Sequence, residues 1–262
     1  MNDRIFKSDQ IPNNPLEMPP PYWRSSGAIF HILDALHSLP ELLSELISVH
    51  GYTELRLGEY YEQHPDEASN DDELEEFGEI CNDLWELEHR IKLKAELVIL
   101  MSAIQAEDEI NRFCVFNLHK DIAESIESLS PAEKLLIASA SFGKANTKGS
   151  AVYEAIKKLS AWRNAFAHGH CVDRPTKSLR HNHLIAPPQY PGVPDSLAKM
   201  QELTLCYRRI DEYLSAISLN EYTKGRSTEI EELSEYLDEI SAYKFSVSPN
   251  SNDIYEIEYN KT

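Results

Sequence analysis

A long helical pattern in the middle of the chain constrains the fold more than any other feature of the sequence. From Leu74 to Phe113, apolar residues recur mostly three and four positions apart, which places them on one face of a helix. Neither proline nor glycine interrupts the chain between Gly78 and Pro131. This pattern predicts two long helices or one bent helix, and its apolar stripe must be buried against other helices.

Most of the remaining chain also follows helical rather than alternating spacing, and nine glycines in 262 residues leave few points of interruption. The expected fold class is therefore all-α. Before the central segment we expect two shorter helices, divided by a break or kink at Pro40, the second ending near Gly51. The polar, acidic stretch 62–76 is the best candidate for a linker.

Capping residues mark the helix starts that follow the central segment. Ser130, Pro131 and Glu133 have the order of a capping box with proline at the first helical position. Residues 141–150 are expected to form a loop, because glycine, serine and polar residues cluster there. Ser150 should then cap the next helix.

The C-terminal third is expected to contain two more helices and a short tail. One helix should begin at Asp195, and an acidic one should cover 228–243. In the tail, Tyr255, Ile257 and Tyr259 alternate with acidic residues, a pattern typical of an edge strand, although a disordered tail is the open alternative.

The sequence divides into three expected regions. Residues 1–70 should form a proline-rich arm with an N-terminal helical extension, residues 71–222 a helical bundle, and residues 223–262 an acidic C-terminal helix and tail. No apolar run is long enough for a transmembrane helix, and the N-terminus has no apolar signal core, so we expect a cytoplasmic protein without a membrane partner. Four widely spaced cysteines favour small buried thiols over a disulfide framework.

The net charge of -19 argues against a nucleic-acid partner, because such proteins usually carry a basic surface. The distribution of charge is uneven, however. Between Lys120 and Arg180 there are ten lysines and arginines against six aspartates and glutamates. This region is locally basic within an acidic chain, which weakens the objection to RNA without removing it.

The candidate functional residues lie at the end of one predicted helix, in the segment LSAWRNAFAHGHC from Leu159 to Cys171. Gly169 should end this helix at His168. Asn164 and His168 are four residues apart and so are neighbours on the helix surface. Arg163 starts about 140° around the helix from His168, but its long side chain can swing towards the same opening.

The chemistry of these three side chains suits a phosphate group undergoing proton transfer. Arg163 is a permanent cation, and Asn164 supplies an amide. The imidazole of His168 titrates near neutrality, and the negative end of the helix dipole favours its protonated form. The opposite face is apolar and should pack in the core; it comprises Val152, Ile156, Leu159 and Phe166.

The residues Arg163-Asn164-Ala165-Phe166-Ala167-His168 resemble the R-x4–6-H motif of the HEPN superfamily, including the polar residue after the arginine. The resemblance covers residues 71–222 and implies a compact all-α bundle. Many HEPN domains are metal-independent endoribonucleases of toxins, anti-phage systems and RNA-targeting CRISPR effectors. One HEPN group is silenced by nucleotidyl transfer to a tyrosine two positions after the histidine, and this chain has His170 there.

The resemblance also implies how the residues would act. His168 would transfer protons, Arg163 would stabilise charge on the phosphoryl oxygens, and Asn164 would orient the imidazole or the phosphate. The active unit would be a symmetric homodimer that pools two copies of the motif, with no cofactor. Because many HEPN ribonucleases belong to toxin or anti-phage systems, the resemblance also implies an antitoxin or defence-system protein as a partner.

The segment after the motif is rich in basic residues and histidines. A basic lip that holds RNA backbone is expected there, with a solvated loop as the equal alternative; its residues are His170, Arg174, Lys177 and Arg180. A tetrahedral zinc site is another alternative, formed by His168, His170, Cys171, His181 and His183. The spacing of these residues matches no familiar zinc finger, so we expect no metal. A zinc-dependent hydrolase built on this cluster is the third hypothesis for the function.

Two neighbouring features have simpler interpretations. Glu107, Asp108 and Glu109 lie on the long central helix beside the motif helix, where a solvated charged face is more common than a catalytic carboxylate pair. Trp162 is expected in the core or at the dimer contact.

The function that these residues favour is a metal-independent endoribonuclease. The alternative from another class is a non-catalytic HEPN-like module that binds nucleotide or a partner protein, which the acidic composition suits.

Overall fold

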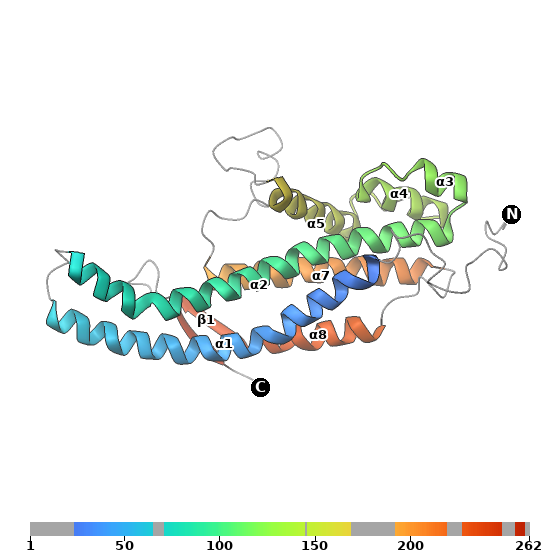
Figure 1. The fold of residues 1–262 in the computed structure, drawn as a ribbon. Coiled ribbons are helices and arrows are strands. Elements are labelled where there is room, and N and C mark those ends of the chain that lie inside the picture. Colours follow the sequence, from blue (N-terminus) through green and yellow to red (C-terminus); the bar gives the residue numbers. More distant parts are fainter. Residues whose placement is uncertain are drawn as a thin grey trace.

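The central helical pattern folds as one helix, α2 (Asp71–Asn117), which is 47 residues long. In the computed structural model it runs beside α1 (Arg24–Gln63), and the two form a long antiparallel hairpin (Figure 1). The structure describes residues 24–64, 71–144, 146–168, 192–218, 227–247 and 255–259. Within these residues the fold is all-α apart from a two-stranded ribbon, as the sequence predicts.

The N-terminal helices predicted on either side of Pro40 are a single helix of 40 residues. Pro40 lies inside α1, which bends partway along its length (Figure 1), as expected of a helix with an internal proline. The predicted end near Gly51 is wrong. A helical glycine costs about 1 kcal/mol, and the burial of Tyr60, whose ring centroid lies 6.0 Å from that of Phe77 in α2, stabilises the continuation.

Three shorter helices follow α2: α3 (Lys120–Ser125), α4 (Pro131–Ser141) and α5 (Ala151–His168). The predicted capping box of α4 is confirmed. Ser130 Oγ accepts from the backbone N–H of Glu133 at 3.4 Å, and the Glu133 carboxylate accepts from the backbone N–H of Ser130 at 2.9 Å. The Ser130 hydroxyl also donates to this carboxylate at 2.6 Å, and this bond, with the one from the backbone N–H, holds the pKa of Glu133 below its ordinary value.

The C-terminal part contributes α7 (Val193–Ile217) and α8 (Ser227–Ser241), then β1 (Tyr243–Val247) and β2 (Tyr255–Tyr259). α7 begins two residues before the predicted Asp195, after Gly192 at its N-cap and with Pro194 in its first turn. The tail strand is confirmed. The helix predicted through residue 243 ends earlier, because Tyr243 starts β1 and pairs with Tyr259 in an antiparallel ribbon.

One hydrophobic core joins these helices. α2 lies in the middle and contacts α1, α4, α5 and α7, while α8 packs against α1 (Figure 1). The core therefore includes helices from both sides of the boundary expected near residue 70. Its most deeply buried side chains include Ile29, Leu36, Leu43, Ile91, Ile110, Phe113, Leu135 and Tyr207. Cys81, Cys114 and Cys206 are buried free thiols, as predicted.

A buried chain of polar groups fixes the start of α1 against α2. The backbone N–H of Ile29 donates to Gln105 Oε1 at 3.0 Å, and Gln105 Nε2 donates to Glu109 Oε1 at 2.8 Å. Arg112 donates to the other oxygen of Glu109. These contacts offset the cost of burying a carboxylate that is 3% exposed. None of the helices in the described ranges combines the length and the apolar character that a membrane span needs.

Candidate functional site

The site predicted from sequence is carried by α5, which begins where its cap residue predicts. Ser150 Oγ accepts from the backbone N–H of Tyr153 at 3.4 Å, and Ser150 O accepts from that of Glu154 at 3.0 Å. The preceding Gly149 has φ +81°, a conformation that favours glycine. The start of α5 is therefore fixed locally, and its last helical residue is His168, as predicted.

The apolar face of α5 packs against α2 and α7. Its buried side chains are Val152, Ala155, Ile156, Leu159 and Trp162. Trp162 is 4% exposed, so its ring belongs to the core of its own chain, which is the first of the two places expected for it. Burial of this face turns the next residue, Arg163, towards the edge of the α2–α5 contact.

Arg163 connects the two helices by an ion pair. Its Nη1 atom donates to Glu107 Oε2 in α2, and both side chains are partly exposed, at 30% and 27%. Its Nε and Nη2 atoms donate to Asn164 Oδ1 at 3.4 and 3.2 Å. The guanidinium is therefore held on one side by a carboxylate and on another by an amide oxygen.

Among the described residues, this arrangement leaves part of the guanidinium without a partner. An arginine side chain has five N–H groups, and the contacts to Glu107 and Asn164 use three of them. The remaining two lie on the terminal nitrogens, which are the atoms that bind phosphate oxygens in a bidentate manner. Asn164 is exposed and turns its oxygen to Arg163, and its amide N–H groups have no hydrogen-bond partner among the residues that the structure describes.

His168 occupies the last position of α5, one helical turn after Asn164. The structure describes the backbone of His168 but not its side chain, so it gives no contact of the imidazole. The expected basic lip lies outside the described residues; its residues are His170, Arg174, Lys177 and Arg180. The same holds for the remaining members of the alternative zinc cluster, which are Cys171, His181 and His183.

The acidic triplet of α2 is more than a solvated face. Glu109 is buried in the polar chain to Gln105, whereas Glu107 faces α5 and pairs with Arg163. Glu107 is thus a residue of the candidate site that the sequence pattern had assigned to a solvated charged face. It is 56 residues from Arg163, and no local spacing connects the two.

A second charged cluster lies on the α5–α7 side. Glu202 accepts from Lys158 at 2.8 Å and from Lys199 at 2.5 Å, and Lys199 Nζ lies 5.8 Å from the centre of the Trp162 ring. The hydrogen bonds from Lys158 and Lys199 lower the pKa of Glu202, and the bond to Glu202 raises the pKa of Lys158. These contacts attach α7 to the middle of α5.

Comparison with known proteins adds no relative from which a site can be transferred. The chain matches no protein-family model, no curated protein and no solved structure.

Proposed function

We propose that this protein is a metal-independent endoribonuclease of the HEPN type, acting as a toxin or in anti-phage defence. The observation that supports it best is the setting of Arg163. Its guanidinium is oriented by Glu107 and Asn164, keeps two N–H groups for a ligand, and lies in the last turns of a helix that ends at His168. A cation, an amide and an imidazole at one helix end suit a phosphodiester.

The reaction needs no metal because RNA supplies its own nucleophile, the ribose 2′-hydroxyl. A base takes the proton of this hydroxyl while its oxygen bonds to phosphorus, and an acid protonates the 5′-oxygen as the P–O5′ bond breaks. The products are a 2′,3′-cyclic phosphate and a 5′-hydroxyl end. In this proposal His168 exchanges the protons, Arg163 stabilises the charge on the non-bridging oxygens, and Glu107 positions Arg163.

The proposed active unit is a homodimer. Each chain offers one proposed catalytic histidine, His168, whereas the reaction needs one group that removes a proton and another that delivers one. A two-fold axis would bring a second copy of His168 to the same cleft. Basic residues from the 170–180 segment would hold the RNA backbone beside this cleft.

The rival function is a non-catalytic helical module that binds nucleotide or a partner protein. The observation that favours it is the same ion pair, because a pairing of Arg163 with Glu107 also serves simply to join α2 to α5. The net charge of -19 favours a protein partner as well. The two hypotheses differ in whether removal of His168 changes any activity.

The test is cleavage of RNA by the purified full chain in EDTA, with product ends analysed chemically. The proposal expects undiminished cleavage, cyclic-phosphate ends, and loss of cleavage by about 100-fold or more in His168→Ala. His119→Ala is the control, since His119 caps the short helix α3 and lies outside α5. Equal cleavage by His168→Ala and wild type would show that the site is assigned wrongly. Full dependence on zinc would favour the histidine cluster instead.

The homodimer is tested by mixing chains. Co-expression of His168→Ala with wild type should depress activity more than simple dilution predicts, because each mixed dimer has an incomplete site. A protein that is monomeric by light scattering at its working concentration and still cleaves RNA fully would exclude a composite site.

A further inference from the structure

The end of the α1–α2 hairpin extends beyond the helices that cover the rest of it. Figure 1 shows α5, α7 and α8 along one part of the hairpin, whereas the last turns of α1 and the first turns of α2 reach past them. Trp85 precedes Glu107 in α2 by 22 residues, which is about 33 Å along the helix axis. This end of the molecule is therefore separate from the proposed active site.

Aromatic side chains form a continuous row across the two helices at this end. Between ring centroids, Tyr60 lies 5.6 Å from Tyr61 and 6.0 Å from Phe77, and Phe77 lies 6.5 Å from Trp85. Tyr60 is buried, but both ends of the row are open to solvent, because Tyr61 is 58% exposed and Trp85 is 52% exposed. Leu74, one helical turn before Phe77, is 56% exposed. These five residues form the tip cluster.

The part of the tip cluster on α2 is an uncovered helix face. Leu74, Phe77 and Trp85 lie within about 80° of one another around the helix axis. α1 covers only part of this face, since Phe77 contacts Tyr60 while Leu74 and Trp85 remain exposed. Large apolar side chains that gather on an exposed surface mark an interaction site. A helical hairpin with one open side offers a groove in which a third helix packs.

The charge around the tip cluster selects the partner. The 18 residues from Asp71 to Glu88 contain nine aspartates and glutamates and neither lysine nor arginine. Glu75 and Glu86 directly follow Leu74 and Trp85, are exposed, and form no ion pair with another described residue. RNA, an anionic membrane and the same end of a second copy would all be repelled by this charge. A cationic partner is attracted, and its arginines or lysines also stack on exposed tryptophan and tyrosine rings.

We propose that the tip cluster binds a basic amphipathic helix of a partner protein. The apolar side chains of this helix pack on Leu74, Phe77 and Trp85, and its lysines or arginines pair with the surrounding carboxylates. The interaction uses neither Arg163 nor His168, so it holds for a ribonuclease and for a non-catalytic module alike.

The proposal is tested by calorimetric titration of the full chain with a synthetic leucine–lysine peptide of about 18 residues, whose leucines share one helix face. One control peptide has glutamate in place of every lysine, and another has the same composition in scrambled order. The basic amphipathic peptide should bind one per chain and at least about tenfold more tightly than either control, because only it matches both the charge and the apolar surface. Binding should shift tryptophan emission to shorter wavelength, and Trp85→Phe should abolish the shift.

A pair of apolar variants locates the site. Trp85→Ala should weaken peptide binding about tenfold, because it removes the aromatic anchor of the surface. Leu205→Ala removes another half-exposed apolar side chain, from α7, and should bind the peptide as wild type does. His168→Ala should also leave binding unchanged, and Trp85→Ala should cleave RNA at the wild-type rate. Failure of this proposal is thus distinguishable from failure of the proposed ribonuclease function.

A pair of double variants tests the role of charge. Replacement of Glu75 and Glu86 by glutamine should weaken binding about tenfold, whereas the same change at Glu231 and Glu235, two exposed carboxylates of the acidic helix α8, should not. The proposal is overturned if the peptide does not bind at concentrations up to about 1 mM, if a control peptide binds equally well, or if the α8 variant loses as much affinity. Self-association of wild type that Trp85→Ala abolishes would also overturn it, because the occupant would then be a second copy.

Discussion

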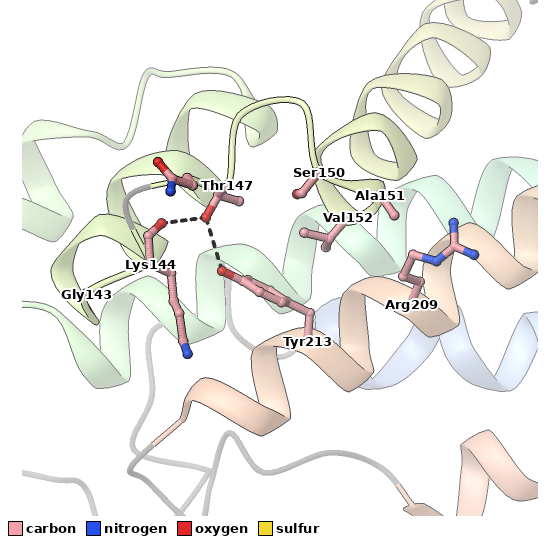
Figure 2. A pocket seen from close by; sticks show the side chains of 9 residues that line it. Gly143, Lys144, Thr147, Ser150, Ala151, Val152, Arg209 and Tyr213 are labelled. Atoms are coloured by element: carbon pink, nitrogen blue, oxygen red, sulfur yellow. Dashed lines mark hydrogen bonds between the residues drawn. The ribbon is translucent and has the colours of Figure 1, made fainter.

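The two ends of α5 differ in how their cations are satisfied. At the C-terminal end, Arg163 is paired with Glu107 and held by Asn164. At the N-terminal end, Lys144 and Arg209 line a pocket between the α4–α5 loop and α7 (Figure 2), and neither takes part in an ion pair between described residues. A paired guanidinium is fixed in direction and has only part of its hydrogen-bonding capacity left, whereas an exposed cation without such a contact keeps its donors for water.

The difference assigns different roles to the two ends. A charge that stabilises a transition state must already point in the right direction, which the Glu107 contact provides for Arg163. Lys144 and Arg209 are exposed and have no such carboxylate contact within the described residues, so their charges are not held in one direction. Substitutions at four residues, with their controls, break or sharpen this comparison.

The largest effect is expected at Trp162, which attaches the C-terminal half of α5 to the core. Trp162→Ala should lower the free energy of unfolding by about 3–5 kcal/mol, because it removes a buried aromatic side chain and leaves a cavity. Arg209→Ala at the other end should change it by less than about 0.5 kcal/mol. Both are measured by denaturant titration. A small loss at Trp162 with a change in oligomeric state would restore the dimer-contact interpretation.

Arg163 should have the next largest effect, on activity rather than on folding. Arg163→Ala is expected to lower the RNA cleavage rate about 100- to 1,000-fold, the usual result of removing one preorganised donor. Lys158→Ala is the matched control, because it removes another glutamate-paired cation from the same helix and should change the rate less than about twofold. Similar losses in both variants would mean that α5 responds only to the loss of ion pairs.

Glu107 tests whether the pairing itself matters. Glu107→Ala should lower kcat about tenfold with little change in KM, because Arg163 would lose its fixed direction. Glu107→Gln should restore most of the rate, since its amide oxygen still accepts from Nη1. Glu86→Ala, which removes an exposed carboxylate of α2, provides the control. A rate that rises in Glu107→Ala would show that the carboxylate competes with RNA for Arg163.

The smallest effect is expected at Glu202, which joins α7 to the middle of α5. Its pKa is lowered by Lys158 and Lys199, so the carboxylate stabilises the fold above its ordinary pKa and loses this contribution as pH falls through the lowered value. Glu202→Gln should therefore cost about 0.2–1 kcal/mol at pH 7, since the group is partly exposed. The difference from wild type should shrink as acid protonates Glu202. A difference independent of pH would mean that the ion pair contributes nothing.

Features decided by residues close in sequence were predictable. The start of α4 at Pro131 follows from a serine, a proline and a glutamate in order, and the last helical residue of α5, His168, is the one that the sequence predicts. The all-α class follows from apolar spacing over a segment without proline or glycine. Each of these features depends on residues within one or two helical turns of one another, so the order of residues in the sequence is enough to predict it.

Other features were decided only by the tertiary structure. α1 continues through Gly51 because its far half packs on α2, and Tyr243 leaves the helical pattern because its buried hydroxyl donates to Pro40 O at 2.9 Å. Glu107 meets Arg163 across 56 residues of sequence. The pocket likewise combines a loop with a helix that begins 49 residues after Lys144. Sequence by itself determined the fold class, the helix caps and a candidate motif, because these are local. Helix packing decided which charges are paired and which face a cavity, since that depends on distances between residues remote in the chain.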